Sequence, residues 1–160
     1  MSRKGKMKRI YLDTAAGLGN PSSIHEEGVS AHKALDNARA KVAELIGAHP
    51  DEIIFTSGGT EGNNLAIFGT VSVRRRTSNI ITTSIEHASI TEPAKKLGAT
   101  FLPVDESGIV NPEEIKKALT LARHNGGPET KLVSIIYANN EIGTIQPIGE
   151  IARVIRNFKK

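Results

Sequence analysis

The sequence predicts an α/β fold in which helices flank a mainly parallel sheet. Short runs rich in isoleucine and valine alternate along the chain with longer segments in which apolar residues recur every three or four positions. The short runs are apolar throughout, which is typical of strands covered on both faces. A chain of 160 residues is long enough for a hydrophobic core. We therefore expect a single domain over residues 1–160.

The strands are expected where these short apolar runs lie. Because parallel strands are joined by helices, such a pattern places the carboxyl ends of the strands at one edge of the sheet. Ligands of open α/β sheets bind beyond that edge. The segments that directly follow the strands are therefore the first places to search for function. The predicted strands are residues 52–55, 79–83, 100–104 and 131–137.

Three segments have the periodicity of amphipathic helices. In residues 31–46 the apolar side chains form one stripe, and Gly47 follows where a C-terminal cap belongs. A second helix is expected after Asn111, a good N-cap, with Pro112 at the first helical position. A third opens at Pro147. The side chains expected to face the core are Ala31, Leu35, Ala38, Val42, Leu45 and Ile46 in the first helix, Ile115, Ala118, Leu119 and Ala122 in the second, and Ile148, Ile151, Ala152 and Ile155 in the third.

The composition excludes several kinds of site. The sequence has no cysteine, which excludes disulfides, thiolate metal sites and a cysteine nucleophile within it. No apolar run comes close to the length of about 18 residues that a membrane-spanning helix requires. The basic start of the chain lacks the apolar stretch of a secretory signal. We expect a cytoplasmic protein that does not contact membranes.

The net charge of +4 does not by itself indicate nucleic-acid binding. The positive charge is concentrated in residues 3–9, 74–76 and 159–160. No aromatic residue is interleaved with these clusters to stack on bases. We interpret them as solvated surface and expect no nucleic-acid partner.

A glycine-rich segment, Thr56-Ser57-Gly58-Gly59-Thr60-Glu61-Gly62-Asn63-Asn64, follows the first predicted strand and leads into a helix. Backbone N–H groups at such a helix start suit a phosphate, and the hydroxyls of Ser57 and Thr60 could add donors. The glycine spacing matches neither the dinucleotide-binding fingerprint nor the P-loop. From the residues alone, a phosphate site and a structural turn are equally good interpretations.

Polar residues also follow two other predicted strands. His87 stands after the strand at 79–83, where it is either a capping histidine or part of a site. No second histidine or acidic residue stands at ligand spacing to it, so we expect no metal site. Asn139 and Asn140 follow the strand at 131–137. Two amides there can bridge polar ligand atoms, and they are equally common as turn formers.

Taken together, the chain resembles the cysteine desulfurases from about Ile10 to its last residue. These enzymes belong to the class V branch of fold-type I pyridoxal phosphate (PLP) enzymes. Each matching segment is a weak signal alone, whereas their order and approximate spacing are highly specific. The segments are Tyr11-Leu12-Asp13, Gly19-Asn20-Pro21-Ser22-Ser23-Ile24-His25, Thr56-Ser57-Gly58-Gly59-Thr60-Glu61, Glu86-His87 and Asn139-Asn140-Glu141-Ile142-Gly143.

The resemblance implies part of the large domain of a fold-type I PLP-dependent transferase, with roles for the matched residues. Gly59 and Thr60 correspond to the loop that binds the cofactor phosphate. His87 corresponds to the histidine that stacks on the pyridine ring and is proposed to move protons, and it is the expected catalytic residue. Asn140 corresponds to the asparagine near the ring hydroxyl and the substrate carboxylate. The implied cofactor is therefore pyridoxal 5′-phosphate.

The resemblance implies an activity that this sequence does not complete. In the family, L-cysteine is converted to L-alanine while sulfur passes to an enzyme cysteine, for iron–sulfur cluster assembly or tRNA thiolation. The family's aspartate at the pyridine nitrogen, its Ser-Gly-His-Lys segment with the Schiff-base lysine, and its sulfur-accepting cysteine have no counterpart here. We expect weak PLP binding and no activity from this chain alone.

Two further features depart from the family pattern. Family members usually insert a helix between the Leu-Asp and Gly-Asn-Pro segments, where this sequence has only residues 14–18. Gly62 stands where the family often has serine. The first departure leaves open how the initial segment packs.

Three hypotheses follow. The chain is the first part of a desulfurase whose second part is separate or lost, a non-catalytic PLP- or phosphate-binding or assembly module, or the N-terminal part of another class V aminotransferase. The Gly-Asn-Pro-Ser-Ser and Asn-Asn-Glu-Ile-Gly segments favour the first. Because a partial sheet leaves backbone groups unpaired, we expect a complementary C-terminal chain or a homo-oligomer. A sulfur-acceptor protein is expected if the chain is part of an active enzyme.

Overall fold

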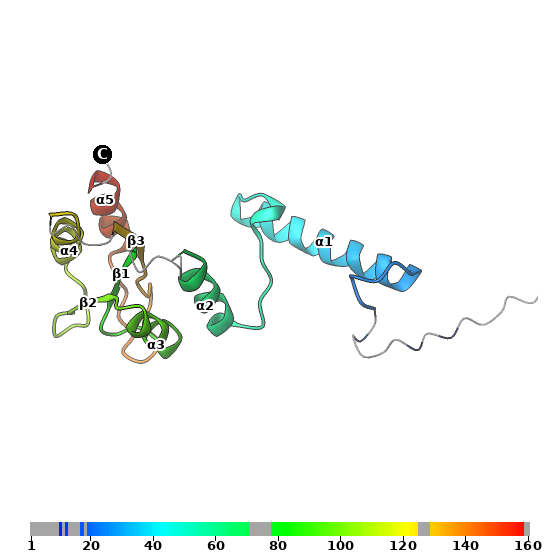
Figure 1. Cartoon of the computed structure of the whole chain (residues 1–160), viewed down its shortest axis with the longest axis horizontal. Coiled ribbons are helices and arrows are strands. Elements are labelled where there is room, and N and C mark those ends of the chain that lie inside the picture. Colours follow the sequence, from blue (N-terminus) through cyan, green and yellow to red (C-terminus); the bar gives the residue numbers. More distant parts are fainter. Residues whose placement is uncertain are drawn as a thin grey trace, which may run out of the picture. The chain divides into compact units, whose positions relative to one another are not determined.

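The computed structural model describes Ile10, Leu12, Gly17 and residues 19–70, 78–124 and 129–158. The chain divides into two compact units, residues 1–55 and 56–160. Figure 1 shows the elements of each. The three basic clusters of the sequence lie outside the described residues, as do Tyr11 and Asp13 of the first family segment.

The first unit contains the helix α1 (Glu26–Ile46) and the short 3-10 helix η1 (Pro50–Glu52). The predicted end of α1 is confirmed: Gly47 has the left-handed φ of 67°, and its N–H donates to the carbonyls of Ala43 and Glu44. The predicted apolar stripe is present in sequence but largely exposed, with Leu45 85% and Ile46 67% accessible. The apolar face of α1 therefore has little covering it within this unit.

The predicted strand at residues 52–55 is wrong. Glu52 ends η1, Ile53 has an extended backbone, and residues 53–55 pair with no strand among the described residues. Arg39 of α1 holds this segment instead, because its guanidinium donates to the Ile53 carbonyl and lies 5.2 Å from the centre of the Phe55 ring. Local β-propensity extends the backbone, but a strand also requires a neighbouring strand to pair with.

The second unit holds a parallel three-stranded sheet in the order β2-β1-β3. Its strands are β1 (Ser78–Thr83), β2 (Thr100–Leu102) and β3 (Glu129–Val133). Its helices are α2 (Gly59–Thr70), α3 (Ala88–Lys96), α4 (Pro112–His124) and α5 (Ile148–Phe158). The mainly parallel sheet with flanking helices that the sequence predicts is confirmed.

The predicted strand at 100–104 is shorter than expected, and the one at 131–137 is displaced, because β3 begins at Glu129 and ends at Val133. Thr83, the last residue of β1, is paired with Leu102, and Ile81 is paired with Val133. Beyond that point the N–H of Ile136 donates to a side-chain carboxylate rather than to a strand. The pairing of β3 with β1 also shifts register between Asn79 and Ile80.

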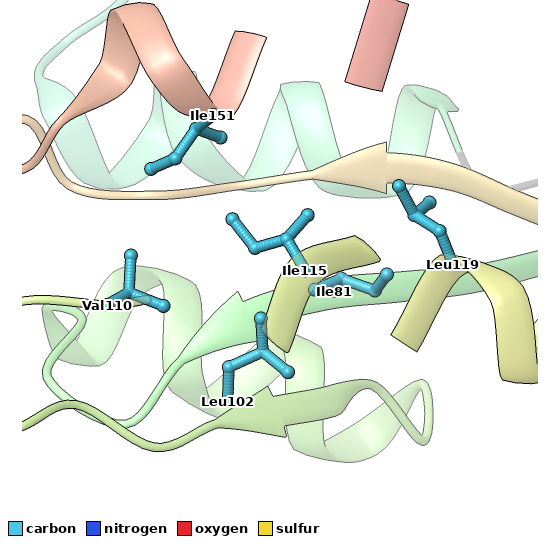
Figure 2. Packing of buried hydrophobic residues seen from close by; sticks show 6 residues of the cluster. All are labelled: Ile81, Leu102, Val110, Ile115, Leu119 and Ile151. Carbon is cyan, nitrogen blue, oxygen red and sulfur yellow. The ribbon is translucent and has the colours of Figure 1, made fainter. Parts of the chain in front are cut away.

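Helices cover both faces of the sheet. Ile81 of β1 packs with α4 and α5, whereas Ile80, its neighbour in sequence, packs with Ile67 of α2 and Ile90 of α3. Successive strand residues point to opposite faces, so a buried strand needs apolar side chains at both. Figure 2 shows the cluster on the α4 and α5 side, which contains Ile81, Leu102, Val110, Ile115, Leu119 and Ile151.

The predictions for α4 and α5 are confirmed. Asn111 caps α4, since its Oδ1 accepts from the N–H of Glu113 at 2.9 Å. Ile115 and Leu119 are buried as expected, and so is Ile151 of α5. Among the described residues, no helix combines the length and the apolar character that a membrane crossing requires.

Candidate functional site

Three loops of the second unit carry the residues that the sequence singles out. One is the glycine-rich segment that begins α2, one joins β1 to α3, and one joins β3 to α5. The last two follow neighbouring parallel strands and so lie at the same edge of the sheet.

The glycine-rich segment begins α2 at Gly59. A Cβ added to Gly58 or Gly59 would meet no other atom within 4 Å. The backbone is therefore accessible to a ligand, and the first N–H groups of a helix have no partner within the helix. Thr60 is exposed at this start, and its hydroxyl has no hydrogen-bond partner in the described part of the chain.

Ser57 has another role than the phosphate donor suggested by the sequence. Its backbone N–H and its hydroxyl both donate to one carboxylate oxygen of Glu61, each at 2.6 Å. These two bonds lower the pKa of Glu61, with the hydroxyl as the larger cause. Ser57 therefore closes the first turn of α2 with Glu61, and Thr60 is the hydroxyl left for a ligand.

His87 is the N-cap of α3. Its Nδ1 accepts from the Ser89 N–H at 3.1 Å and lies 2.8 Å from the Ser89 hydroxyl oxygen. Asn63 of α2 donates from Nδ2 to the same hydroxyl oxygen at 2.8 Å. The capping interpretation of His87 is confirmed. Sequence reasoning missed Asn63 and Ser89.

Thr60 and His87 line the same cleft. It has a volume of about 380 Å³ and lies between α2 and α3. A second hollow of about 550 Å³ also reaches Thr60. The residues that line the first cleft include Thr60, Asn64, Phe68, His87, Ser89 and Lys96.

Asn140 does not line this cleft; it is an exposed residue of the loop after β3. Its neighbour Asn139 is 7% accessible and organises that loop. The Asn139 side chain donates to the carbonyl of Ile85 at 2.9 Å and accepts from the N–H groups of Glu141 and Ile142 at 2.8 and 3.1 Å. The loop that carries Asn140 is thereby attached two residues before His87.

Glu86 makes a second connection between these two loops. Its Oε1 accepts from the Thr83 hydroxyl at 2.7 Å and from the Ile136 N–H at 2.8 Å. Burial raises the pKa of Glu86, and the two hydrogen bonds partly oppose that shift. The side chain next to His87 in sequence thus holds the backbone after β3.

Gln146 fastens the far end of the same loop. It is 2% accessible, accepts from the Val110 N–H at 3.0 Å and donates to the Gly108 carbonyl at 2.6 Å. Gly108 has a φ of +76°, and a Cβ there would lie 2.6 Å from Cδ1 of Ile142. Sequence reasoning missed Asn139, Glu86 and Gln146 as positioning residues because their partners are distant in the sequence.

The arrangement fits a phosphorylated aromatic ligand better than a metal. A helix start with open glycines and a hydroxyl suits a phosphate, and an exposed imidazole in the same cleft suits a flat ring. No group of three histidine or acidic side chains that could hold a metal ion occurs among the described residues.

The sequence matches the family described as aminotransferase class-V over residues 6–160. It is 47% identical to the cysteine desulfurase IscS of Dictyoglomus turgidum over 177 aligned positions, which include 95% of this chain and 43% of that protein. That alignment is longer than this chain, so the relative has insertions. The chain spans less than half the length of the curated relatives it matches.

Solved structures share the fold. A structure described as SspA in complex with cysteine is 33% identical, with a TM-score of 0.74, and the match covers 91% of this chain and 42% of that one. C-DES, solved as a mutant with glycine covalently linked to its PLP cofactor, is 23% identical with a TM-score of 0.64, covering 86% and 35%. The second likeness concerns the fold alone.

Proposed function

Since the chain belongs to the aminotransferase class-V family and is homologous to cysteine desulfurases, we propose that it supplies the PLP-binding part of a desulfurase. The observation that carries the proposal is the cleft that Thr60 and His87 share at the glycine-rich start of α2. This cleft combines an anion-binding helix start with a flat, titratable ring.

In this proposal each matched residue has a distinct task. The backbone of Gly59 and the hydroxyl of Thr60 bind the cofactor phosphate. His87 lies against the ring and holds a proton beside it. Asn140 contacts the ring hydroxyl or the substrate carboxylate, and Asn139 holds the loop that presents it. When bound, PLP supplies a reactive aldehyde and an electron-withdrawing ring.

Conversion of L-cysteine to L-alanine with sulfur transfer needs two groups that this sequence does not provide. It contains no cysteine to accept sulfur and no Ser-Gly-His-Lys segment. We place both groups, and the partner of the pyridine nitrogen, on a complementary polypeptide. The structural neighbour described as a complex with cysteine supports the choice of substrate class. A sulfur-acceptor protein would then serve the assembled enzyme.

PLP binding to the purified chain tests the proposal. We expect reversible binding that is weakened about tenfold by Thr60→Ala, the effect of losing one hydrogen bond to a charged group. Pyridoxal, which lacks the phosphate, should bind the unchanged chain more weakly than PLP does. Its affinity for Thr60→Ala should equal its affinity for the unchanged chain. Absorbance and fluorescence titrations measure both.

Lys96 requires a control because it lines the cleft and carries an amine. We expect Lys96→Arg to bind PLP as the unchanged chain does, without the absorbance of a covalent lysine adduct. Binding that is indifferent to both the phosphate and Thr60 would contradict the proposal. A strong adduct that persists in Lys96→Arg would show that the chain contains a reactive lysine after all.

A further inference from the structure

We propose that Asn63 and Ser89 are positioning residues that fix the neutral ring of His87 in one tautomer, with the proton on Nε2. This inference is drawn from the hydrogen bonds at Nδ1 and rests on the proposed function only for the nature of the ligand.

A backbone N–H can only donate, and the N–H of Ser89 is directed at Nδ1 of His87 at 3.1 Å. Nδ1 must therefore offer a lone pair. In a neutral imidazole the other nitrogen then carries the proton.

The Ser89 hydroxyl can rotate, so its hydrogen can point toward Nδ1 or away from it. Ser89 is 8% accessible, so water has little access to orient its hydroxyl. Asn63 Nδ2 donates to the hydroxyl oxygen at 2.8 Å, and His87 Nδ1 lies 2.8 Å from the same oxygen. Because Nδ1 presents a lone pair and the amide already donates to the oxygen, the hydroxyl directs its own hydrogen toward Nδ1. Both neighbours of Nδ1 therefore act as donors.

The two donors to Nδ1 determine what His87 offers a ligand. Nδ1 is engaged at the start of α3, so Nε2 is the nitrogen available to the cleft. In the neutral ring this nitrogen donates a hydrogen bond and cannot accept one. The group beside it should therefore be an electron-rich oxygen, such as an ionised ring hydroxyl, a carboxylate or a phosphate oxygen. A ligand that offers only a donor there should bind poorly.

Nitrogen-15 NMR of the labelled chain without cofactor tests the tautomer directly. At a pH where His87 is neutral, we expect Nδ1 to resonate as a nitrogen with a lone pair and Nε2 as a protonated nitrogen. The variant His87→Gln assigns these signals. Ser89→Ala should lower the ratio of the two tautomers by about fivefold, the effect of one ordinary hydrogen bond, and Ser89→Thr should restore it.

Asn63→Asp is the sharper variant. A carboxylate would accept from the Ser89 hydroxyl and turn its hydrogen away from Nδ1, so the ratio should fall as in Ser89→Ala. Asn79→Asp is the matched control: it makes the same substitution in β1, where the side chain contacts Thr130 and Thr100 rather than Ser89. It should leave the tautomer unchanged.

The outcomes separate this inference from the proposed function. Equal populations, or an excess of the Nδ1–H form in the unchanged chain, would overturn the inference even if PLP binds. The expected tautomer in a chain that binds no PLP would support the inference and contradict the proposed function. Circular dichroism of each variant shows that a changed ratio does not arise from unfolding.

Discussion

At the scale of single residues, the polar side chains that join the loops after β1 and β3 bind mainly backbone groups. Glu86 and Asn139 each hold a backbone group of the other's loop, and Gln146 does the same for the turn at Gly108. A partly buried carboxyl in such a role also responds to pH. The direction of its pKa shift distinguishes Glu86 from the exposed Glu61 and Glu92, whose pKa values are lowered.

The raised pKa of Glu86 predicts the sign of that response. The unfolded carboxyl titrates near its ordinary value of 4.5, and the folded one titrates at higher pH because burial disfavours its charge. Between these two values the folded state binds more protons. The contribution of Glu86 to stability is therefore complete below 4.5 and is lost as the pH rises through the folded pKa.

Replacing Glu86 with glutamine should remove this loss. Both hydrogen bonds go to Oε1, which the glutamine carbonyl can reproduce. We expect the free energy of unfolding of Glu86→Gln, relative to the unchanged chain, to rise from pH 4.5 toward neutral pH. Urea unfolding over that range measures it.

Glu61→Gln is the control, because the pKa of Glu61 is lowered by its bonds to Ser57. Its contribution is present above its ordinary value of 4.5 and is lost as the pH falls through the folded pKa. Its replacement should therefore change the acid side of the profile. Identical profiles for the two variants would contradict the assignment to Glu86.

Residue roles could be predicted from sequence only where the chemistry is local. The glycine-rich helix start and the position of His87 after a strand depend on neighbouring residues. The bonds of Glu86 and Asn139 join residues 50 and 54 positions apart. Nothing in the local pattern gives such partners, so these residues resemble ordinary turn formers in the sequence.

At the scale of elements, helix ends were predictable and strand pairing was not. The caps at Asn111 and Gly47 follow from local chemistry, and both are confirmed. The segment at 52–55 has the composition of a strand, but pairing depends on a neighbour that composition does not supply. The same limit explains why β3 ends at Val133: the Ser134 N–H still donates to the Ile81 carbonyl, but the Ile136 N–H donates to the carboxylate of Glu86.

The turn at Gly108 offers a test of how tightly the loops are joined. We expect Gly108→Ala to destabilise the second unit by about 1–2 kcal/mol for its positive φ and by a smaller amount for its contact with Cδ1 of Ile142, the tip of a side chain that is 56% accessible. Gly98→Ala is the matched control, since Gly98 has a φ of +70° with no atom within 4 Å of an added Cβ. It should show the first effect only.

Removing the contacting methyl separates the two effects. Ile142→Val lacks Cδ1, the atom that would lie 2.6 Å from the added Cβ. Adding Ile142→Val to Gly108→Ala should therefore recover part of the second effect, as measured by urea unfolding. Equal losses for Gly108→Ala and Gly98→Ala would mean that the loops adjust without strain.

At the scale of the whole chain, family membership extends over nearly all residues, while the match covers less than half of each curated relative. Large apolar side chains of the first unit are exposed, among them Leu45 at 85%, Ile54 at 66% and Phe55 at 46%. Such side chains would gain from burial, and we expect a complementary chain to provide part of it.

Co-expression with the remaining segment of the Dictyoglomus turgidum desulfurase tests that expectation. In the presence of a thiol that reduces the enzyme persulfide, we expect the two polypeptides to co-purify and to release sulfide from L-cysteine, whereas this chain alone releases none. Thr60→Ala should reduce sulfide release at least about tenfold without abolishing co-purification, because it removes one bond to a charged group. Two polypeptides that purify separately would argue against a split enzyme.

The shifted pairing between β1 and β3 determines where a residue can be deleted from β3 without disturbing the sheet. Thr130 is opposite Asn79 and Leu132 is opposite Ile80, so Lys131 is a supernumerary residue in the ladder. Deleting Lys131 would leave the residues on both sides with the partners they already have. Deleting a residue beyond the bulge, such as Val133, would instead exchange inward and outward side chains over the rest of the strand. A gap in an alignment of this strand is therefore tolerated best at the bulge.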